Sequence, residues 1–324
     1  MAQNRPIETE NKAQRIDMGE LIYQNCWAFM RELRTHNKTK TVYPVDPYAE
    51  VYQFRDNTYG IFTPNYDGGG DPWSYLIVGP EKAMLIDTGC GVGDLKGLVR
   101  EIIHDKDLIV ANTHPHPDHS GGNAQFEQVY ILEADVEGLE RSMTRPFLSD
   151  RVVNADGSCR MVKFDFADVI ERKEYKIVPI PDGYLFDLGG GYTVETIMLA
   201  GHAAGQAAFL DRQTKCLFCG DDIIGMRVSV YGGIERIVDF RDRMAKLAAR
   251  IDEIEGIFPG HFVTDLDNTS ILCMLDTLNR IVENPENYDY VEERSGHGTT
   301  YCKAVLGLGA VGYSAAAFTK EDGK

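Results

Sequence analysis

The stretch THPHPDHSGG, residues 113–122, is the most informative part of this sequence. It places three of the eight histidines and one aspartate within six positions, and two glycines follow after Ser120. The preceding run DLIVANTH is typical of a buried strand. We therefore expect the histidines in the loop at the carboxyl end of a strand, where a rigid element can hold polar side chains in place.

These residue types in this pattern point to metal binding. Imidazole nitrogens and carboxylate oxygens are ligands that zinc accepts. His114 and His116 lie two positions apart on an extended segment, so they point to the same side and can bind one ion. Asp118 and His119 fall where the chain turns and can face a second ion. A loop whose histidines are merely solvated is the weaker interpretation.

Composition narrows the classes of function. The chain has 324 residues, 43% of them hydrophobic, which fits one main globular domain. It carries 50 acidic against 33 basic residues, a net charge of −17, which disfavours nucleic acid and anionic membranes as partners. The N-terminal residues lack the apolar run of a signal peptide, so we expect a cytoplasmic protein.

The cysteines are expected to be reduced thiols. Their number, seven, is odd and does not suit a disulfide framework. Cys216 and Cys219 form a CxxC pattern, but the sequence has no second pair of this kind. Because the surrounding run predicts a strand, two buried strand cysteines are favoured over a redox or zinc site.

The hydrophobic pattern divides the chain into an extension, a core and a tail. Residues 15–36 carry apolar side chains at helical spacing, so 1–45 is predicted to be an N-terminal helical extension. The main domain is predicted to span 46–285. Within it, 144–175 lacks a clear period and is interpreted as an insertion or lid. Residues 286–324 form a C-terminal extension that we expect to pack on the core.

Strands and helices are predicted to alternate in two blocks of the main domain. The first starts near residue 50 and includes a helix over 92–105 and another over 135–143. The second starts near residue 177 with five short β-type runs, and helices over 234–256 and 267–284 follow. Sheet-rich blocks that each end in helices favour two sheets with helices outside them.

The HPHPDH motif resembles the HxHxDH signature of the metallo-β-lactamase superfamily. Four further motifs of that family occur in family order between about residues 50 and 265: IDTG at Asp87, AGHAAGQ at His202, CGDD at Asp221 and PGHF at His261. The resemblance implies the family's α+β fold, an αββα sandwich. It also implies a catalytic domain over 46–285.

The resemblance implies two zinc ions per chain, with iron or manganese as alternatives. The first would be bound by His114, His116 and His202. The second would be bound by Asp118, His119 and His261.

Three aspartates near these ligands take other implied roles. Asp221 would bridge the two ions and, with Asp118, count as catalytic. Asp222 is the alternative bridging residue, but in the family's Gly-Asp motif the ligand directly follows the glycine, which favours Asp221. Asp87 would orient a ligand ring by a hydrogen bond. The remaining histidines are expected at the surface or at helix ends: His36, His104 and His297.

A dinuclear centre predicts hydrolysis by a metal-bridging hydroxide. The expected substrate is a small acyl compound: a lactone, a thioester, or a related ester or amide. Alternatives on the same motif set are phosphodiesterase or β-lactamase activity, a mononuclear iron persulfide dioxygenase, and a protein that only binds. Many exported β-lactamases have cysteine in place of Asp221, and lactonases often have tyrosine where Ile224 stands. His116 argues against a flavodiiron oxygen reductase.

The remaining expectations concern the substrate pocket and the oligomeric state. Tyr66, Trp73 and Tyr231 are candidate pocket residues, because aromatics near a metal site offer apolar recognition. The alternative is that the aromatics of 59–75 belong to core strands. A homodimer through 15–36 or through the tail is a further expectation.

Overall fold

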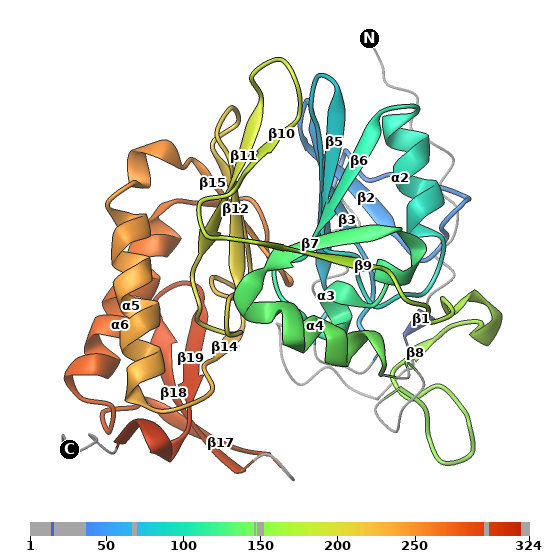
Figure 1. Ribbon diagram of the computed structural model, residues 1–324. Coiled ribbons are helices and arrows are strands. Elements are labelled where there is room, and N and C mark those ends of the chain that lie inside the picture. Colours follow the sequence, from blue (N-terminus) through green and yellow to red (C-terminus); the bar gives the residue numbers. More distant parts are fainter. Residues whose placement is uncertain are drawn as a thin grey trace. The chain divides into compact units, whose positions relative to one another are not determined.

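The computed structural model describes residues 14–15, 37–66, 70–145, 147, 152–294 and 298–318 (Figure 1). By their contacts these residues fall into two units. Unit 1 comprises Met1–Ile131, Val136–Pro179 and Asp187–Tyr192, and unit 2 comprises Leu132–Asp135, Ile180–Phe186 and Thr193–Lys324.

Unit 1 is built on a seven-stranded sheet in the order β2-β3-β4-β5-β6-β7-β9. The strands are β2 (Glu50–Arg55), β3 (Thr58–Phe62), β4 (Trp73–Val78), β5 (Lys82–Ile86), β6 (Asp107–Ala111), β7 (Gln128–Leu132) and β9 (Lys176–Ile180). β2 to β5 are antiparallel neighbours, whereas β5 pairs parallel with β6 and β6 with β7. A parallel pair needs a crossover, and α2 (Leu95–Ile103) supplies it between β5 and β6.

Helix α2 shows why the predicted helix forms there. Its apolar residues Leu95, Leu98, Val99 and Ile103 recur at helical spacing and are buried. The side chain of the N-cap residue, Asp94, accepts a hydrogen bond from the backbone N–H of Gly97, which satisfies one of the free donors at the helix start. Two more helices follow in unit 1, α3 (Pro117–Ser120) and α4 (Val136–Met143).

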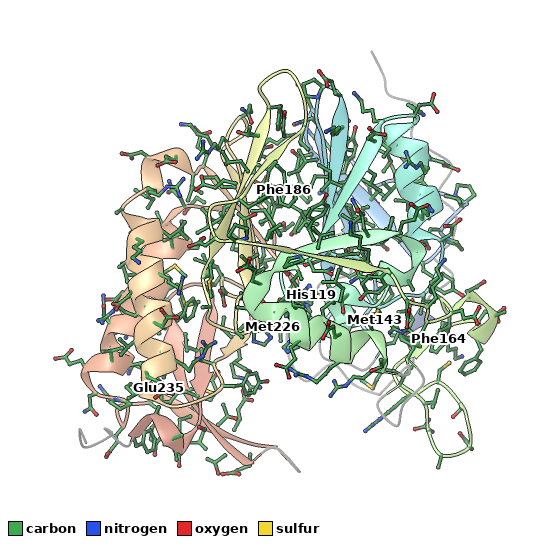
Figure 2. The ribbon with its side chains drawn as sticks, viewed as in Figure 1. His119, Met143, Phe164, Phe186, Met226 and Glu235 are labelled. Carbon is green, nitrogen blue, oxygen red and sulfur yellow. The ribbon has the colours of Figure 1, made fainter. Side chains whose placement is uncertain are left out.

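The 144–175 insertion packs on unit 1 where the structure describes it. It contains β8 (Val162–Lys163) and the short 3-10 helix η3 (Phe166–Asp168), and β8 pairs with β1 (Gln14–Arg15). Phe164, labelled in Figure 2, lies in one apolar cluster with Tyr66 and Cys90. Of the helix predicted over 15–36, Arg15 is in a strand, so the prediction is wrong there; residues 16–36 lie outside the described residues.

Unit 2 contains a six-stranded sheet in the order β10-β11-β12-β13-β15-β16. These strands are β10 (Leu185–Asp187), β11 (Thr193–Met198), β12 (Ala207–Asp211), β13 (Cys216–Gly220), β15 (Gly256–Pro259) and β16 (Leu266–Asp267). The helices α5 (Ile234–Ala248) and α6 (Thr269–Glu283) bury Phe240 and Met274 in one core with strand residues such as Leu217. The predicted first helix was too long, since α5 ends at Ala248 and 251–253 form a 3-10 turn.

The C-terminal residues add a second sheet to unit 2, in the order β14-β19-β18-β17. Its strands are β14 (Arg227–Ser229), β17 (Tyr290–Arg294), β18 (Gly298–Val305) and β19 (Gly309–Tyr313), and the 3-10 helix η5 (Ala315–Phe318) follows. Val305, Val311 and Tyr313 belong to the same buried core as α5 and α6.

The cysteines of the described residues are all free thiols, and Cys216 and Cys219 are buried in β13. Both predictions about the cysteines are confirmed for this part of the chain. Within the described residues, no helix has the length and apolar character that crossing a membrane requires.

Candidate functional site

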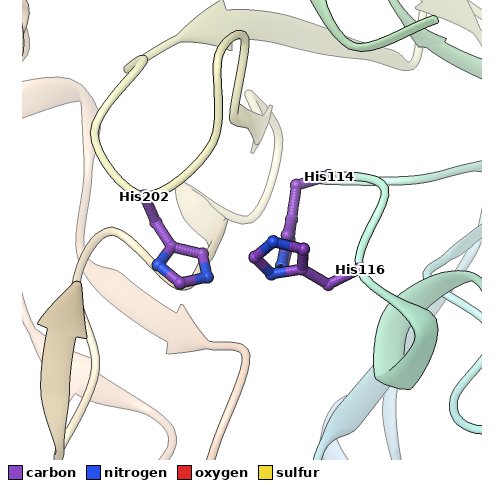
Figure 3. A group of neighbouring side chains, drawn as sticks. All are labelled: His114, His116 and His202. Carbon is purple, nitrogen blue, oxygen red and sulfur yellow. Dashed lines mark hydrogen bonds between the residues drawn. The ribbon is translucent and has the colours of Figure 1, made fainter. Parts of the chain in front are cut away.

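The HPHPDH loop begins directly after β6 in unit 1. His114 and His119 are fully buried, and His116 is the residue before α3. The Nε2 atom of His114 lies 3.1 Å from the Nδ1 atom of His116; Figure 3 shows both rings. Two nitrogens bound to one tetrahedral zinc at its usual bond length lie roughly 3.3 Å apart, so this pair has the spacing of metal ligands.

Asp87 fixes the orientation of His119. It follows β5, and its Oδ2 atom lies 2.9 Å from the Nδ1 atom of His119. The same carboxylate accepts hydrogen bonds from the backbone N–H and the hydroxyl of Thr113, each at 2.8 Å. Because a carboxylate only accepts, Nδ1 of His119 carries the proton and Nε2 presents a lone pair to a metal. The role of Asp87 in orienting a metal ligand stays a prediction, which this hydrogen bond supports.

Asp118 lies on the same loop in a more accessible position. Its side chain is 25% exposed, whereas that of His119 is not exposed at all. The Oδ2 atom of Asp118 lies 3.9 Å from the Nε2 atom of His119 and accepts a hydrogen bond from the side-chain amide of Asn65 at 3.3 Å. Unit 1 therefore holds His114, His116, Asp118 and His119 on one short segment of chain.

Unit 2 brings together three residues that are distant in the sequence. Asp221 directly follows β13, and His261 lies two residues after β15, its parallel neighbour. The Oδ2 atom of Asp221 lies 3.3 Å from the Nε2 atom of His261 and 3.6 Å from the Nε2 atom of His202. One carboxylate oxygen thus faces two imidazole nitrogens at ligand spacing.

The loop that carries His202, drawn in Figure 3, is held by several hydrogen bonds within unit 2. The Nδ1 atom of His202 donates to the backbone carbonyl of Ser229 at 3.0 Å, which leaves Nε2 available to a metal. The backbone N–H of the same residue donates to Asp222 at 2.7 Å. Asp135 accepts from the backbone N–H groups of Gly205 and Gln206 at 2.9 and 2.8 Å.

Asp221 and Asp222 are distinguished by their partners. Asp222 is fully buried and its carboxyl group faces the backbone before His202, whereas Asp221 faces the His202 and His261 rings. Burial raises the pKa of Asp222 well above its ordinary value, against the opposing effect of the backbone hydrogen bonds. The geometry of unit 2 therefore favours Asp221 as the metal ligand and Asp222 as a support of the loop.

A sequence model described as "Metallo-beta-lactamase superfamily" matches residues 67–270. The chain belongs to this superfamily. It is a hydrolase of that family, and the resemblance inferred from HPHPDH is confirmed.

Curated relatives of this superfamily member are named as thioesterases. Acyl-coenzyme A thioesterase MBLAC2 from Homo sapiens is 30% identical over 226 residues, which cover 64% of this chain and 79% of the relative. Atrochrysone carboxyl ACP thioesterase nsrC from Aspergillus novofumigatus is 25% identical over 155 residues, which cover 47% of this chain and 38% of that protein.

Solved structures show the fold of the superfamily member. A metallo-beta-lactamase from Pontibacter korlensis matches with a TM-score of 0.52 and 18% identity, covering 71% of this chain and 99% of that one. The DIM-1 metallo-beta-lactamase matches with a TM-score of 0.52 and 15% identity, covering 72% and 99%. The predicted α+β metallo-β-lactamase fold is confirmed.

Several supporting residues of this superfamily member were not found by sequence reasoning. Asp135 was noted only as the start of a predicted helix, and Asn65, Thr113 and Ser229 were not singled out. Their contacts join segments far apart in the sequence, or use a backbone carbonyl, so no local pattern reveals them. Burial raises the pKa of Asp135, and the Gly205 and Gln206 N–H groups oppose this shift.

The candidate pocket aromatics lie in different environments. Trp73 is 2% exposed and packs edge-on against Tyr52 and Phe62, and Tyr66 is also 2% exposed and packs against Phe164. This burial favours the core alternative for both. Tyr231 is 66% exposed, with its ring centroid 6.1 Å from that of His202. A pocket role stays a prediction for all three.

The histidines outside the ligand motifs are described only in part. His104 ends α2, with a positive φ of 54°, which agrees with the helix-end role expected of it. His36 and His297 lie outside the described residues.

Proposed function

We propose that this protein hydrolyses small acyl thioesters at a dinuclear zinc centre. The observation that carries the substrate class is the 30% identity to acyl-coenzyme A thioesterases over 226 residues. The reaction type is supported by ligand-spaced histidines and aspartates in each unit, a donor set that suits zinc and also accepts iron or manganese.

The proposed centre combines the ligands of unit 1 with those of unit 2. The family resemblance supports this, because it implies one ion bound by His114, His116 and His202 and a second ion bound by Asp118, His119 and His261. The first set of residues is drawn in Figure 3. Within unit 2, Asp221 faces both His202 and His261, which fits the role of bridge.

Bound zinc would supply an activated water and a Lewis acid for the thioester carbonyl. The protein's own contribution is to hold its ligand rings in one tautomer, through Asp87 for His119 and Ser229 for His202. Asp118, the more exposed carboxylate, is placed to accept the proton that water loses. In the overall step a C–O bond forms, the C–S bond breaks, and the proton ends on the thiolate.

The test combines metal content with initial rates. The purified protein is assayed for metals and for hydrolysis of an acyl-coenzyme A, a lactone, a chromogenic β-lactam and a phosphodiester. We expect two zinc ions per chain and thioester turnover, both lost in Asp221→Ala and kept in Asp105→Ala, which removes an exposed carboxylate.

Two results would contradict the proposal. Turnover of the β-lactam or phosphodiester with an inert thioester would overturn the substrate class. One iron per chain, with oxygen uptake on a persulfide and no hydrolysis, would replace the hydrolase by a dioxygenase.

A further inference from the structure

Unit 1 contains a cavity that the proposed metal centre does not use. Its volume is about 580 Å³, and we call it the lysine groove. Its lining is Lys96, Gln125, Phe126, Glu127, Lys173, Glu174, Tyr175 and Lys176. The volume is in the range of cavities that hold small molecules or cofactors.

The lysine groove carries ammonium groups that form no pair with any residue the structure describes. Among the described residues, the ammonium groups of Lys96, Lys173 and Lys176 make no ion pair or hydrogen bond. Glu127 and Glu174 share the lining but form no ion pair with them. The groove therefore has three cations against two anions in a chain whose net charge is −17. Such a local excess attracts an anionic ligand.

The groove also has an aromatic surface. Phe126 is 6% exposed, and Tyr175 is half-buried and packs against the core of unit 1. The hydroxyl of Tyr175 accepts a hydrogen bond from the side-chain amide of Asn123 at 3.2 Å, which holds the ring in place. A fixed aromatic ring beside ammonium groups suits a ligand that joins a planar base to phosphates.

Hydrogen bonds connect the groove to the HPHPDH loop. The side chain of Asn123 donates to Asn112 at 2.7 Å, and the side chain of Asn112 donates to the backbone carbonyl of His119 at 3.0 Å. Gln125 lies six residues after His119, so their Cα atoms are at most about 22 Å apart. A phosphopantetheine arm spans a distance of this order.

We propose that the lysine groove binds the nucleotide end of coenzyme A, its adenosine 3′-phosphate 5′-diphosphate, while the acyl thioester reaches the metal centre. The inference rests on the proposed thioesterase function for its biological role. Binding at the groove does not itself require turnover.

Titration with a substrate fragment tests the groove directly. Adenosine 3′,5′-bisphosphate is titrated calorimetrically into the full-length protein and into the triple variant Lys96→Gln, Lys173→Gln, Lys176→Gln. A control variant with the same charge change carries Lys163→Gln, Lys215→Gln and Lys246→Gln. We expect at least about tenfold weaker binding in the groove variant, parental affinity in the control, and weaker binding at higher salt. Hydrogen exchange of the parent should slow in 123–127 and 172–176.

Equal affinity in the groove variant and the parent, or no binding to the parent at millimolar bisphosphate, would overturn the inference. Kinetics separate this failure from failure of the proposed function. With acyl-coenzyme A, the groove variant should show a raised KM and unchanged kcat. With an acyl-N-acetylcysteamine thioester, which lacks the nucleotide, it should match the parent. If all variants hydrolysed both thioesters equally well, the result would support the thioesterase function and contradict nucleotide binding at the lysine groove.

Discussion

The two sets of candidate ligands are built in opposite ways. In unit 1, four ligands lie within six consecutive positions after β6. In unit 2, three ligands come from three places in the chain, and Asp221 and His261 meet because β13 and β15 are parallel neighbours. The first set depends on a short loop and the second on a completed sheet. Candidate metal ligands can thus be local in sequence in one unit and brought together only by the fold in the other.

The carboxylates that hold the candidate ligands in place also differ between the two units. In unit 1 the buried carboxylate of Asp87 contacts a ligand ring directly. In unit 2 the carboxylates of Asp135 and Asp222 contact the backbone of the loop that carries His202. Side-chain contact fixes one ring, whereas backbone contact fixes the path of a whole loop.

The largest expected effect is that of Asp221→Ala, which removes the carboxylate that faces the rings of His202 and His261. We expect kcat/KM for the thioester to fall roughly 10⁴-fold, about 5 kcal/mol of transition-state stabilisation. Zinc content should fall with it. His116→Ala provides the comparison in unit 1, and a smaller loss there would show that the dispersed set is the more critical one. Retention of both zinc ions and rate in Asp221→Ala would exclude it as a ligand.

A second comparison concerns buried carboxyl groups that accept different numbers of hydrogen bonds. Burial raises the pKa of Asp46 in unit 1 to about 7, with smaller contributions from Asp94 and Asp168, whereas Asp135 accepts two backbone N–H groups. The pKa of Asp46 in the folded protein lies above its unfolded value of 3.8, so ionising this carboxyl group destabilises the folded state. The destabilisation grows as pH rises from about 4 to 7.

Asp46→Asn should therefore stabilise the protein at alkaline pH. We expect a gain of up to about 4 kcal/mol in the free energy of unfolding above pH 7, and little change at pH 4. Asp46 accepts a hydrogen bond from the backbone N–H of Tyr48, with 3.2 Å between the nitrogen and Oδ1. The side-chain amide of asparagine keeps an oxygen that can accept the same bond. Urea unfolding at pH 4 and pH 8 measures this. A gain of equal size at both pH values would assign the effect to packing instead of charge.

Asp87→Asn and Asp135→Asn compare the two kinds of support. Second-layer partners of metal ligands typically change affinity by roughly 10- to 100-fold. We expect Asp87→Asn to lie near the upper end, because the amide has one acceptor oxygen where the carboxylate uses two, for the His119 ring and for the Thr113 N–H. We expect Asp135→Asn to lie near the lower end. Zinc competition with a chromophoric chelator measures both. The reverse order would show that the path of the loop matters more than the orientation of a ring.

The smallest expected effect on stability is that of Tyr231→Ala. Its side chain is 66% exposed, so the free energy of unfolding should change by less than about 0.5 kcal/mol. If Tyr231 contacts substrate near His202, KM should rise several-fold with kcat unchanged. An unchanged KM would show that Tyr231 is not a substrate-pocket residue.

The parts of the molecule that are local in sequence were predictable. The strand and loop around His114, helix α2 and the strand nature of Cys216 and Cys219 follow from periodicity within short windows. The end of α5 was not predictable, because Ala249 to Ile254 keep a helical composition while the chain turns into β15. The ligands of unit 2 became visible only through family motifs, since no spacing rule links His202 to His261.

The parallel pairing of β13 with β15 brings Asp221 and His261 together only late in the synthesis of the chain. Gly260 donates a backbone hydrogen bond to Gly220 at 2.7 Å, and α5 lies in the chain between these two residues. The side chains that hold the HPHPDH loop, those of Asn65, Asp87 and Asn112, precede it in the sequence, and the loop itself is translated more than a hundred residues before this pairing. Contacts between distant residues form slowly. The candidate ligands of unit 1 and the residues that hold them are therefore synthesised before the sheet that joins Asp221 to His261 can form.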